Sequence, residues 1–65
     1  MPYEKLTDLP EAAQALPQHG QAIFQAAFNA AFAEYDGNEG RAFATAWAAV
    51  CKKYEKDADG VWRPL

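Results

Sequence analysis

The 65-residue chain contains one cysteine, one histidine and no serine. A single cysteine excludes an internal disulfide, and one cysteine with one histidine cannot supply the ligands of a nitrogen–sulfur zinc site. No apolar run approaches the roughly 18 residues that a transmembrane helix needs, and the first residues lack the pattern of a signal peptide. We therefore expect a cytoplasmic protein in a reducing compartment, with Cys51 packed as a small apolar side chain.

The chain also lacks a recognisable catalytic pair. His19 stands near an expected helix start, and no nucleophile and base are identifiable beside it. The run Asp57–Gly60 is similar to the start of a calcium loop, but the sequence has no bidentate glutamate at the spacing that such a loop needs. We expect a surface or capping histidine, a simple turn at 57–60, and a protein that is not an enzyme and has no metal or cofactor.

The chain is long enough for one small domain, 1–65, and we expect a free energy of unfolding of a few kcal/mol. Charge is distributed unevenly along it. The formal net charge is -3; residues 1–40 carry one basic and six acidic side chains, which gives -5, and residues 41–65 carry five basic and three acidic ones, which gives +2. A domain with this polarity can orient against a charged partner. The basic side chains of the second half are Arg41, Lys52, Lys53, Lys56 and Arg63.

Large apolar residues at helical spacing predict two amphipathic helices. One set is Phe24, Phe28 and Phe32, and the other is Phe43, Trp47 and Cys51. Recurrence every four residues places each set on one side of its helix, so each must be buried. We expect the two stripes to face each other, and Trp47→Ala to cost roughly 3–5 kcal/mol. The predicted core is Ile23, Phe24, Phe28, Phe32, Phe43, Trp47, Val50, Cys51, Tyr54 and Trp62.

Prolines and capping residues predict a short first helix. Asp8 is a candidate N-cap, with Pro10 in the first turn and Glu11 as the return partner of a capping box. The helix is expected to end at about Leu16, because Pro17 disfavours a helical conformation in the residue before it.

Two longer helices are expected to follow, over about 18–35 and about 39–55. Gly37 is the natural left-handed stop between them, and Asn38 can cap the later helix. A connection this short predicts antiparallel neighbours. Because the only segments of strand character are Tyr3–Lys5 and Val61–Arg63, we also expect a small antiparallel ribbon that joins the termini. The expected fold is mainly α: a short helix and an antiparallel helix pair, closed by this two-stranded ribbon.

Several short motifs occur in order along nearly the whole chain. They are Met1-Pro2-Tyr3, Asp8-Leu9-Pro10-Glu11, Leu16-Pro17-Gln18-His19, Ile23-Phe24, Ala27-Phe28-Asn29-Ala30-Ala31, Ala46-Trp47-Ala48-Ala49-Val50, Lys53-Tyr54 and Trp62. In this combination the chain resembles the ChaB family of small bacterial and viral domains. The resemblance implies a compact set of helices with a small sheet, and a regulatory role towards a sodium(calcium)/proton antiporter. The chain departs from the family in its short connection between the long helices and its short tail after Trp62.

The resemblance and the absence of catalytic groups together predict a non-enzymatic regulatory or adaptor domain. Its partner is expected to be the cytoplasmic face of a cation antiporter or another protein. The candidate partner-binding residues are Arg41, Lys52, Lys53, Lys56 and Arg63. The alternative is a nucleic-acid-associated module that uses the same cations with Tyr54 and Trp62, although five scattered contacts imply weak binding at physiological salt. The oligomeric state stays open.

Overall fold

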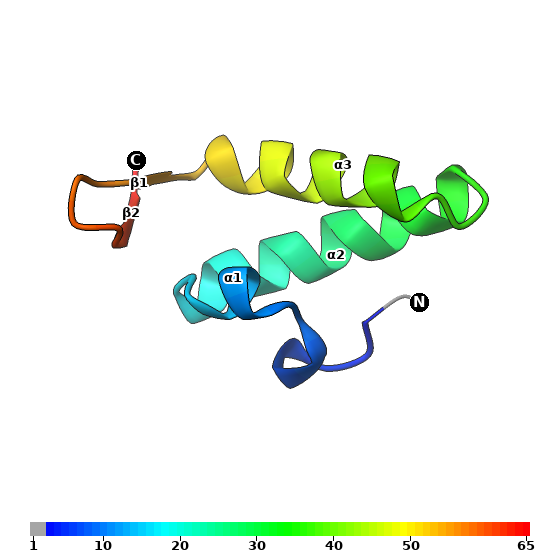
Figure 1. Ribbon diagram of the computed structural model, residues 1–65, viewed down its shortest axis with the longest axis horizontal. Coiled ribbons are helices and arrows are strands. Elements are labelled where there is room, and N and C mark those ends of the chain that lie inside the picture. The colour runs from blue at the N-terminus through cyan, green and yellow to red at the C-terminus, as the bar shows by residue number, and fades with distance from the viewer. Residues whose placement is uncertain (1–2) are drawn as a thin grey trace.

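The structure is a computed structural model that describes residues 3–65, so Met1 and Pro2 of the first motif lie outside it. Within the described residues, a short 3-10 helix and three α-helices precede a β-hairpin. The elements are η1 (Leu6–Asp8), α1 (Glu11–Gln14), α2 (Gln18–Glu34), α3 (Glu39–Cys51), β1 (Tyr54–Lys56) and β2 (Trp62–Pro64). Helices α2 and α3 run side by side in opposite directions, and the hairpin continues from the end of α3 (Figure 1). The predicted mainly helical class, with an antiparallel helix pair and a two-stranded antiparallel sheet, is confirmed.

The first helix begins later than its predicted cap. Asp8 is the last residue of η1, and Pro10 occupies the N-cap position of α1 without a side-chain hydrogen bond. Leu9 is extended, with φ -65° and ψ 154°, as a residue before proline prefers. The capping box predicted for Asp8 and Glu11 is therefore wrong, because this extended residue separates Asp8 from the helix.

The connection between α2 and α3 is a tight left-handed turn. The N–H of Gly37 donates to the carbonyl of Phe32 at 2.8 Å, which is the long hydrogen bond of a Schellman motif. Both Asp36 (φ 54°) and Gly37 (φ 83°) are left-handed, so the stop starts one residue before the predicted glycine. Asn38 caps α3 as predicted, because its side-chain oxygen accepts from the N–H of Arg41 at 3.1 Å.

The third helix ends at Cys51, four residues before its predicted end, and the chain then becomes extended. Strand β1 pairs with β2 in antiparallel register, with Lys56 opposite Trp62. The predicted pairing of 3–5 with 61–63 is therefore wrong, because β2 pairs with β1 instead. A five-residue connection over 57–61 joins the two strands. Closing this short loop costs less entropy than pairing 3–5 with 61–63.

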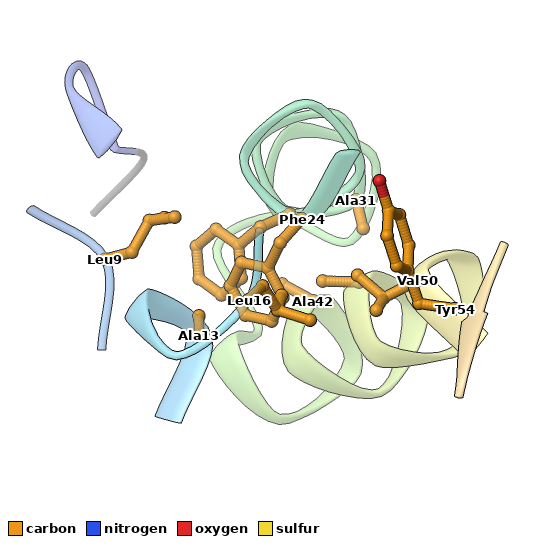
Figure 2. Close-up of a cluster of buried hydrophobic side chains, with 10 residues drawn as sticks. Leu9, Ala13, Leu16, Phe24, Ala31, Ala42, Val50 and Tyr54 are labelled. Carbon is orange, nitrogen blue, oxygen red and sulfur yellow. The ribbon is translucent and has the colours of Figure 1, made fainter. Parts of the chain in front are cut away.

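The core lies between α2 and α3 and is extended by the N-terminal segment (Figure 2). Its buried members are Leu9, Ala13, Leu16, Phe24, Phe28, Ala31, Ala42, Ala46, Val50 and Tyr54. Leu9, Ala13 and Leu16 belong to the short N-terminal elements and were absent from the predicted core. The first helix thus covers one end of the long helix pair instead of standing apart from it.

The buried stripe of α3 is rotated relative to the prediction. It consists of Ala42, Ala46 and Val50, each one residue before a member of the predicted stripe. Alanines let α2 and α3 approach closely, so the rings of Phe43 and Trp47 lie half-buried beside the contact. Cys51 is exposed, and its predicted place in the core is wrong. Three further predicted core residues are half-buried against the cluster, namely Ile23, Phe32 and Trp62.

Gly20 marks the point at which the N-terminal elements and the hairpin meet. It is buried in the first turns of α2. A Cβ atom at this position would lie 3.3 Å from Leu16 Cβ and 3.4 Å from Tyr54 Cε1. The absence of a side chain therefore lets Leu16 and Tyr54 both pack against the start of α2.

Candidate partner-binding surface

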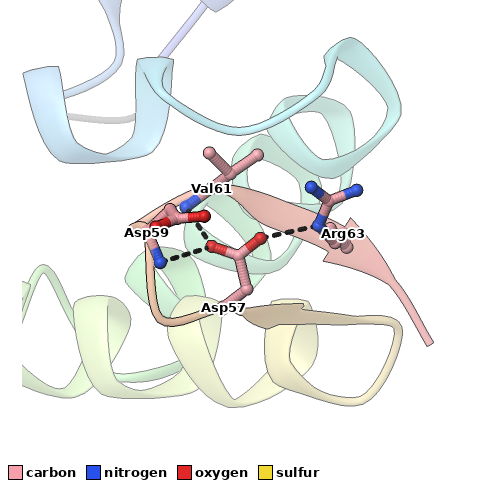
Figure 3. Close-up of polar contacts among 4 residues, drawn as sticks. All are labelled: Asp57, Asp59, Val61 and Arg63. Carbon is pink, nitrogen blue, oxygen red and sulfur yellow. Dashed lines mark hydrogen bonds and ion pairs between the residues drawn. The ribbon is translucent and has the colours of Figure 1, made fainter.

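The hairpin turn is organised by the carboxylate of Asp57 (Figure 3). Its Oδ1 atom accepts from the N–H groups of Asp59 and Val61, each at 2.9 Å. Its Oδ2 atom accepts from Arg63 Nε at 2.6 Å, and this contact is also an ion pair. Gly60 has φ 80°, a conformation that glycine adopts without strain. The run Asp57–Gly60 is thus the predicted turn, with its first carboxylate bound to the hairpin itself.

These contacts lower the pKa of Asp57 below its ordinary value of 3.8. The hydrogen bond from Arg63 is the largest cause, and the backbone N–H groups of Val61, Asp59 and Gly60 act in the same direction. Each of these donors stabilises the charged carboxylate more than the protonated acid. The shape of the turn is therefore coupled to the ionisation of one side chain.

A stack of side chains fixes the hairpin to the helices. Trp62 lies against Trp47 of α3, with ring centroids 5.8 Å apart and ring planes at 17°. Trp47 in turn meets the buried Phe24 ring edge-on at 4.9 Å. On the strand opposite Trp62, Lys56 Nζ lies 5.9 Å from the centroid of the Trp62 ring, within range of a cation–π interaction. These contacts form a continuous chain from the buried Phe24, through Trp47 and Trp62, to Lys56 Nζ at the surface.

The five predicted basic residues do not form one patch. Lys52, Lys53 and Lys56 fall within five positions of one another after the end of α3, and all three are exposed. Among residues 3–65 none of these lysines forms an ion pair with a carboxylate. We call these three residues the lysine surface. Their charges are available to a partner because no side chain of the described chain neutralises them directly.

The two predicted arginines differ from the lysines. Arg63 projects from β2 and is engaged by Asp57. Arg41 lies in the first turn of α3, where its guanidinium carbon is 5.2 Å from the centroid of the Tyr35 ring. Arg41 precedes Lys52 by eleven residues, which corresponds to about 16 Å along a helix. The structure thus places Arg41 near the start of α3 and the lysine surface after its end.

Residues 3–65 show neither the catalytic group nor the metal site that was considered from the sequence. His19 is an exposed residue at the start of α2. Its ring centroid is 6.4 Å from that of Tyr54. The described chain contains no pocket and no group of three metal-ligating side chains. None of the helices in residues 3–65 has the length and apolar character to cross a membrane.

Sequence reasoning missed a set of side-chain amides that fasten the N-terminal elements to α2. Gln14 Nε2 donates to the carbonyls of Thr7 and Leu9 at 3.0 and 2.7 Å. Gln21 Nε2 donates to the carbonyls of Gln14 and Leu16, both at 2.9 Å. A glutamine in a helix has no distinctive spacing, so no sequence signal singled out these residues. Their carbonyl partners lie in turns whose course the hydrophobic pattern does not predict.

Comparison with known proteins gives consistent matches. The family model ChaB matches residues 9–64. The protein named "Putative cation transport regulator ChaB" of Escherichia coli (strain K12) is 40% identical over 72 residues, covering 95% of this chain and 95% of that protein. The protein of the same name from Shigella flexneri matches with the same identity and coverage. Because 72 exceeds the 65 residues of this chain, these relatives carry additional residues within the matched region.

The fold has a close counterpart among solved structures. The "NMR solution structure of the putative cation transport regulator ChaB" is 36% identical in sequence, with a TM-score of 0.86. The match covers 98% of this chain and 99% of that one. The likeness therefore extends over the helices and the hairpin alike.

Proposed function

Because the chain belongs to the ChaB family, we propose that it is a non-enzymatic regulatory domain of cation transport that acts by binding another protein. The similar Escherichia coli protein carries the name of a cation transport regulator. The observation that supports binding as the mechanism is the lysine surface, which presents three exposed cations without carboxylate partners in the described chain. The partner is a protein with an acidic segment, and the cytoplasmic face of a membrane cation antiporter is the first candidate.

The hairpin gives this surface a defined shape. Lys53 lies between α3 and β1, and its carbonyl accepts from the N–H of Leu65 at 2.9 Å. Lys56 is positioned over Trp62, which is itself stacked on Trp47. Cations on an ordered scaffold lose less conformational freedom on binding than cations on a flexible tail. Complementary charge then raises the association rate and selects acidic partners.

The test is charge reversal of the two lysines that make no contact with an aromatic ring. Lys52→Glu/Lys53→Glu should weaken binding to a reconstituted sodium(calcium)/proton antiporter by about two- to tenfold, since two exposed charge contacts of some tenths of a kcal/mol each are lost. Affinity is measured in lipid nanodiscs at low and physiological salt. Arg41→Glu, compared with Lys52→Glu alone, is the matched control, because each variant reverses one charge and Arg41 lies at the other end of α3. Equal binding by wild type and the double variant would contradict the role of the lysine surface.

A nucleic-acid-associated function is the second candidate, favoured by the contact between Lys56 and Trp62. A cation beside a half-buried indole is a common element of single-strand binding surfaces. With three available lysines, the slope of log K against log salt should be about -2 for single strands. An NMR titration with short single-stranded DNA and RNA tests this candidate. Absence of shifts at Lys52, Lys53 and Lys56 at low salt would eliminate it.

A further inference from the structure

Two amide side chains of α2 hold the backbone of Tyr3. The N–H of Tyr3 donates to Asn29 Oδ1 at 2.8 Å, and Asn29 Nδ2 donates to the carbonyl of Tyr3, also at 2.8 Å. Gln25 Nε2 donates to the same carbonyl at 3.1 Å. Asn29 thus pairs with both backbone groups of one residue, as a neighbouring strand does in a sheet. Contacts of this kind recognise an extended peptide through its main chain.

The side chain of Tyr3 rests on a ring that the helices hold in place. Its ring centroid is 4.8 Å from that of Phe28, with the planes at 42°. Phe28 is fully buried and also contacts Phe32 at 5.9 Å and Phe43 at 4.8 Å. These rings belong to α2 and α3, so the position of Phe28 does not depend on Tyr3. The amides and the aromatic surface therefore persist when the N-terminal segment is displaced.

The segment that occupies this place is short, and it precedes the first helical element, η1. In Figure 1 it is the dark blue stretch near the middle of α2. Each hydrogen bond contributes a net stabilisation of only about 0.5–1.5 kcal/mol, which the entropy of ordering the segment largely offsets. Segments held by few buried apolar contacts open with free energies far below that of global unfolding.

We propose that Gln25, Phe28 and Asn29 form a binding site for an extended peptide segment that carries a tyrosine or phenylalanine. Tyr3 occupies the site in the closed chain, and a segment of a partner protein replaces it when the N-terminal segment opens. The argument for this ligand is the occupant itself, because Asn29 and Gln25 hold the main chain of Tyr3 and Phe28 contacts its ring. The site is distinct from the lysine surface and does not rest on the function proposed for it.

The environment of the Tyr3 hydroxyl adds a selectivity. The pKa of this hydroxyl is raised, first by burial and second by the carboxylate of Glu39. Both causes disfavour negative charge at this point. A phosphotyrosine, with a charge of about -1.5 to -2, should therefore bind much more weakly than tyrosine.

The experiment uses the full chain carrying Tyr3→Ala, which weakens the internal occupant, and the capped peptide acetyl-Pro-Tyr-Glu-Lys-Leu-amide. Side-chain amide signals of Asn29 and Gln25 are followed by NMR while the peptide is raised to about 5 mM, the range of a short tether's effective concentration. We expect saturable shifts at both amides. The peptides with alanine or phosphotyrosine in place of tyrosine should bind at least about tenfold more weakly, by loss of the ring contact or by added charge.

Two control variants separate this site from other surfaces. Asn29→Leu in the Tyr3→Ala background should abolish the shift at the remaining reporter, the Gln25 amide. Lys52→Glu/Lys53→Glu should leave the shifts of both amides unchanged. Equal shifts from the alanine peptide, or no saturation in the folded variant, would overturn the proposal. Exchange of the N-terminal segment between two copies, detected as concentration-dependent dimerisation of the wild type, would overturn it in favour of self-association.

Hydrogen exchange of the wild type tests the proposal without any substitution. The N–H of Tyr3 should exchange at least about 100-fold faster than that of Phe28, through local opening. Equal protection of the two N–H groups would mean that the segment opens only when the protein unfolds. No partner could then replace it.

Discussion

The N-terminal segment and the C-terminal hairpin are both short and both pack against the long helices, but different chemistry holds each in place. Neutral amides of Gln14, Gln21, Gln25 and Asn29 bind backbone carbonyls of the N-terminal elements. The hairpin depends on the carboxylate of Asp57, which binds two N–H groups and one guanidinium. Amide contacts do not change with pH and are little affected by salt, whereas an exposed ion pair responds to both.

The difference also separates two modes of recognition. The N-terminal side presents main-chain partners and an aromatic ring, which suit an extended peptide. The hairpin side presents free positive charge, which suits an acidic surface and acts at longer range. A domain of this size can therefore offer two contact sites that respond to different conditions. A substitution or a change of pH can disturb either the N-terminal segment or the hairpin, and the undisturbed region then serves as the reference.

The largest expected effect comes from the ring beneath the N-terminal segment. Phe28→Ala should cost about 3–5 kcal/mol, because it leaves a cavity at a fully buried site. Trp47→Ala, beneath the hairpin, should cost about 2–3 kcal/mol, less than the roughly 3–5 kcal/mol expected from the sequence, because Trp47 is half-buried and its loss opens a site at the surface. Urea denaturation followed by circular dichroism measures both. A larger loss for Trp47→Ala would show that the hairpin side carries more of the stability.

An intermediate effect is expected from the amide that binds Tyr3. Asn29→Leu should cost about 1–2 kcal/mol, because two hydrogen bonds to the Tyr3 backbone are lost. Ala26→Leu is the matched control, since it adds the same side chain at an exposed position of α2 without removing a bond. Hydrogen exchange should report faster exchange at the N-terminal elements and unchanged protection in β1 and β2. Faster exchange in the hairpin would show that the two regions are coupled.

The smallest effect is a selective loosening of the hairpin in acid. The pKa of Asp57 is lowered on folding, so its contribution is present above the unfolded value of about 3.8 and is lost as pH falls through the folded value. Amide signals of Asp59 and Val61 should therefore shift below about pH 3.8, whereas the side-chain amide of Asn29 should not. Asp57→Asn should remove this transition. Parallel shifts in both regions would contradict local control by Asp57.

Sequence pattern predicted the elements whose partners are close along the chain. The long helices, their antiparallel packing and the cap at Asn38 follow from periodicity and from side chains with local partners. The start of the first helix was predicted wrongly. Leu9 is extended because it precedes a proline, so Asp8 cannot cap the helix that follows. The strand pairing also failed, since Tyr54 and its neighbours were assigned to α3 and left 61–63 without a nearby partner.

The five basic residues of the second half stay a prediction as partner-binding residues, but the structure shows how they are arranged. Their pairing depends on the hairpin register, which charge alone does not determine. Arg63 meets Asp57 only because the turn brings their strands together. The position of Cys51 shows the same limit, because one residue of rotation about α3 decides between core and surface. No sequence pattern indicated the contact between Tyr3 and Asn29, because the two residues are 26 positions apart.

The stacked indoles of Trp47 and Trp62 have a consequence for observation. They are the only two tryptophans of the chain, and their ring centroids lie 5.8 Å apart. Electronic transitions of two indoles at this distance couple, so the folded hairpin should give an exciton signal in circular dichroism. Helix signals arise from the backbone, so detachment of the hairpin removes one signal and leaves the other. The protein thus carries a built-in optical reporter of hairpin closure that needs no added label.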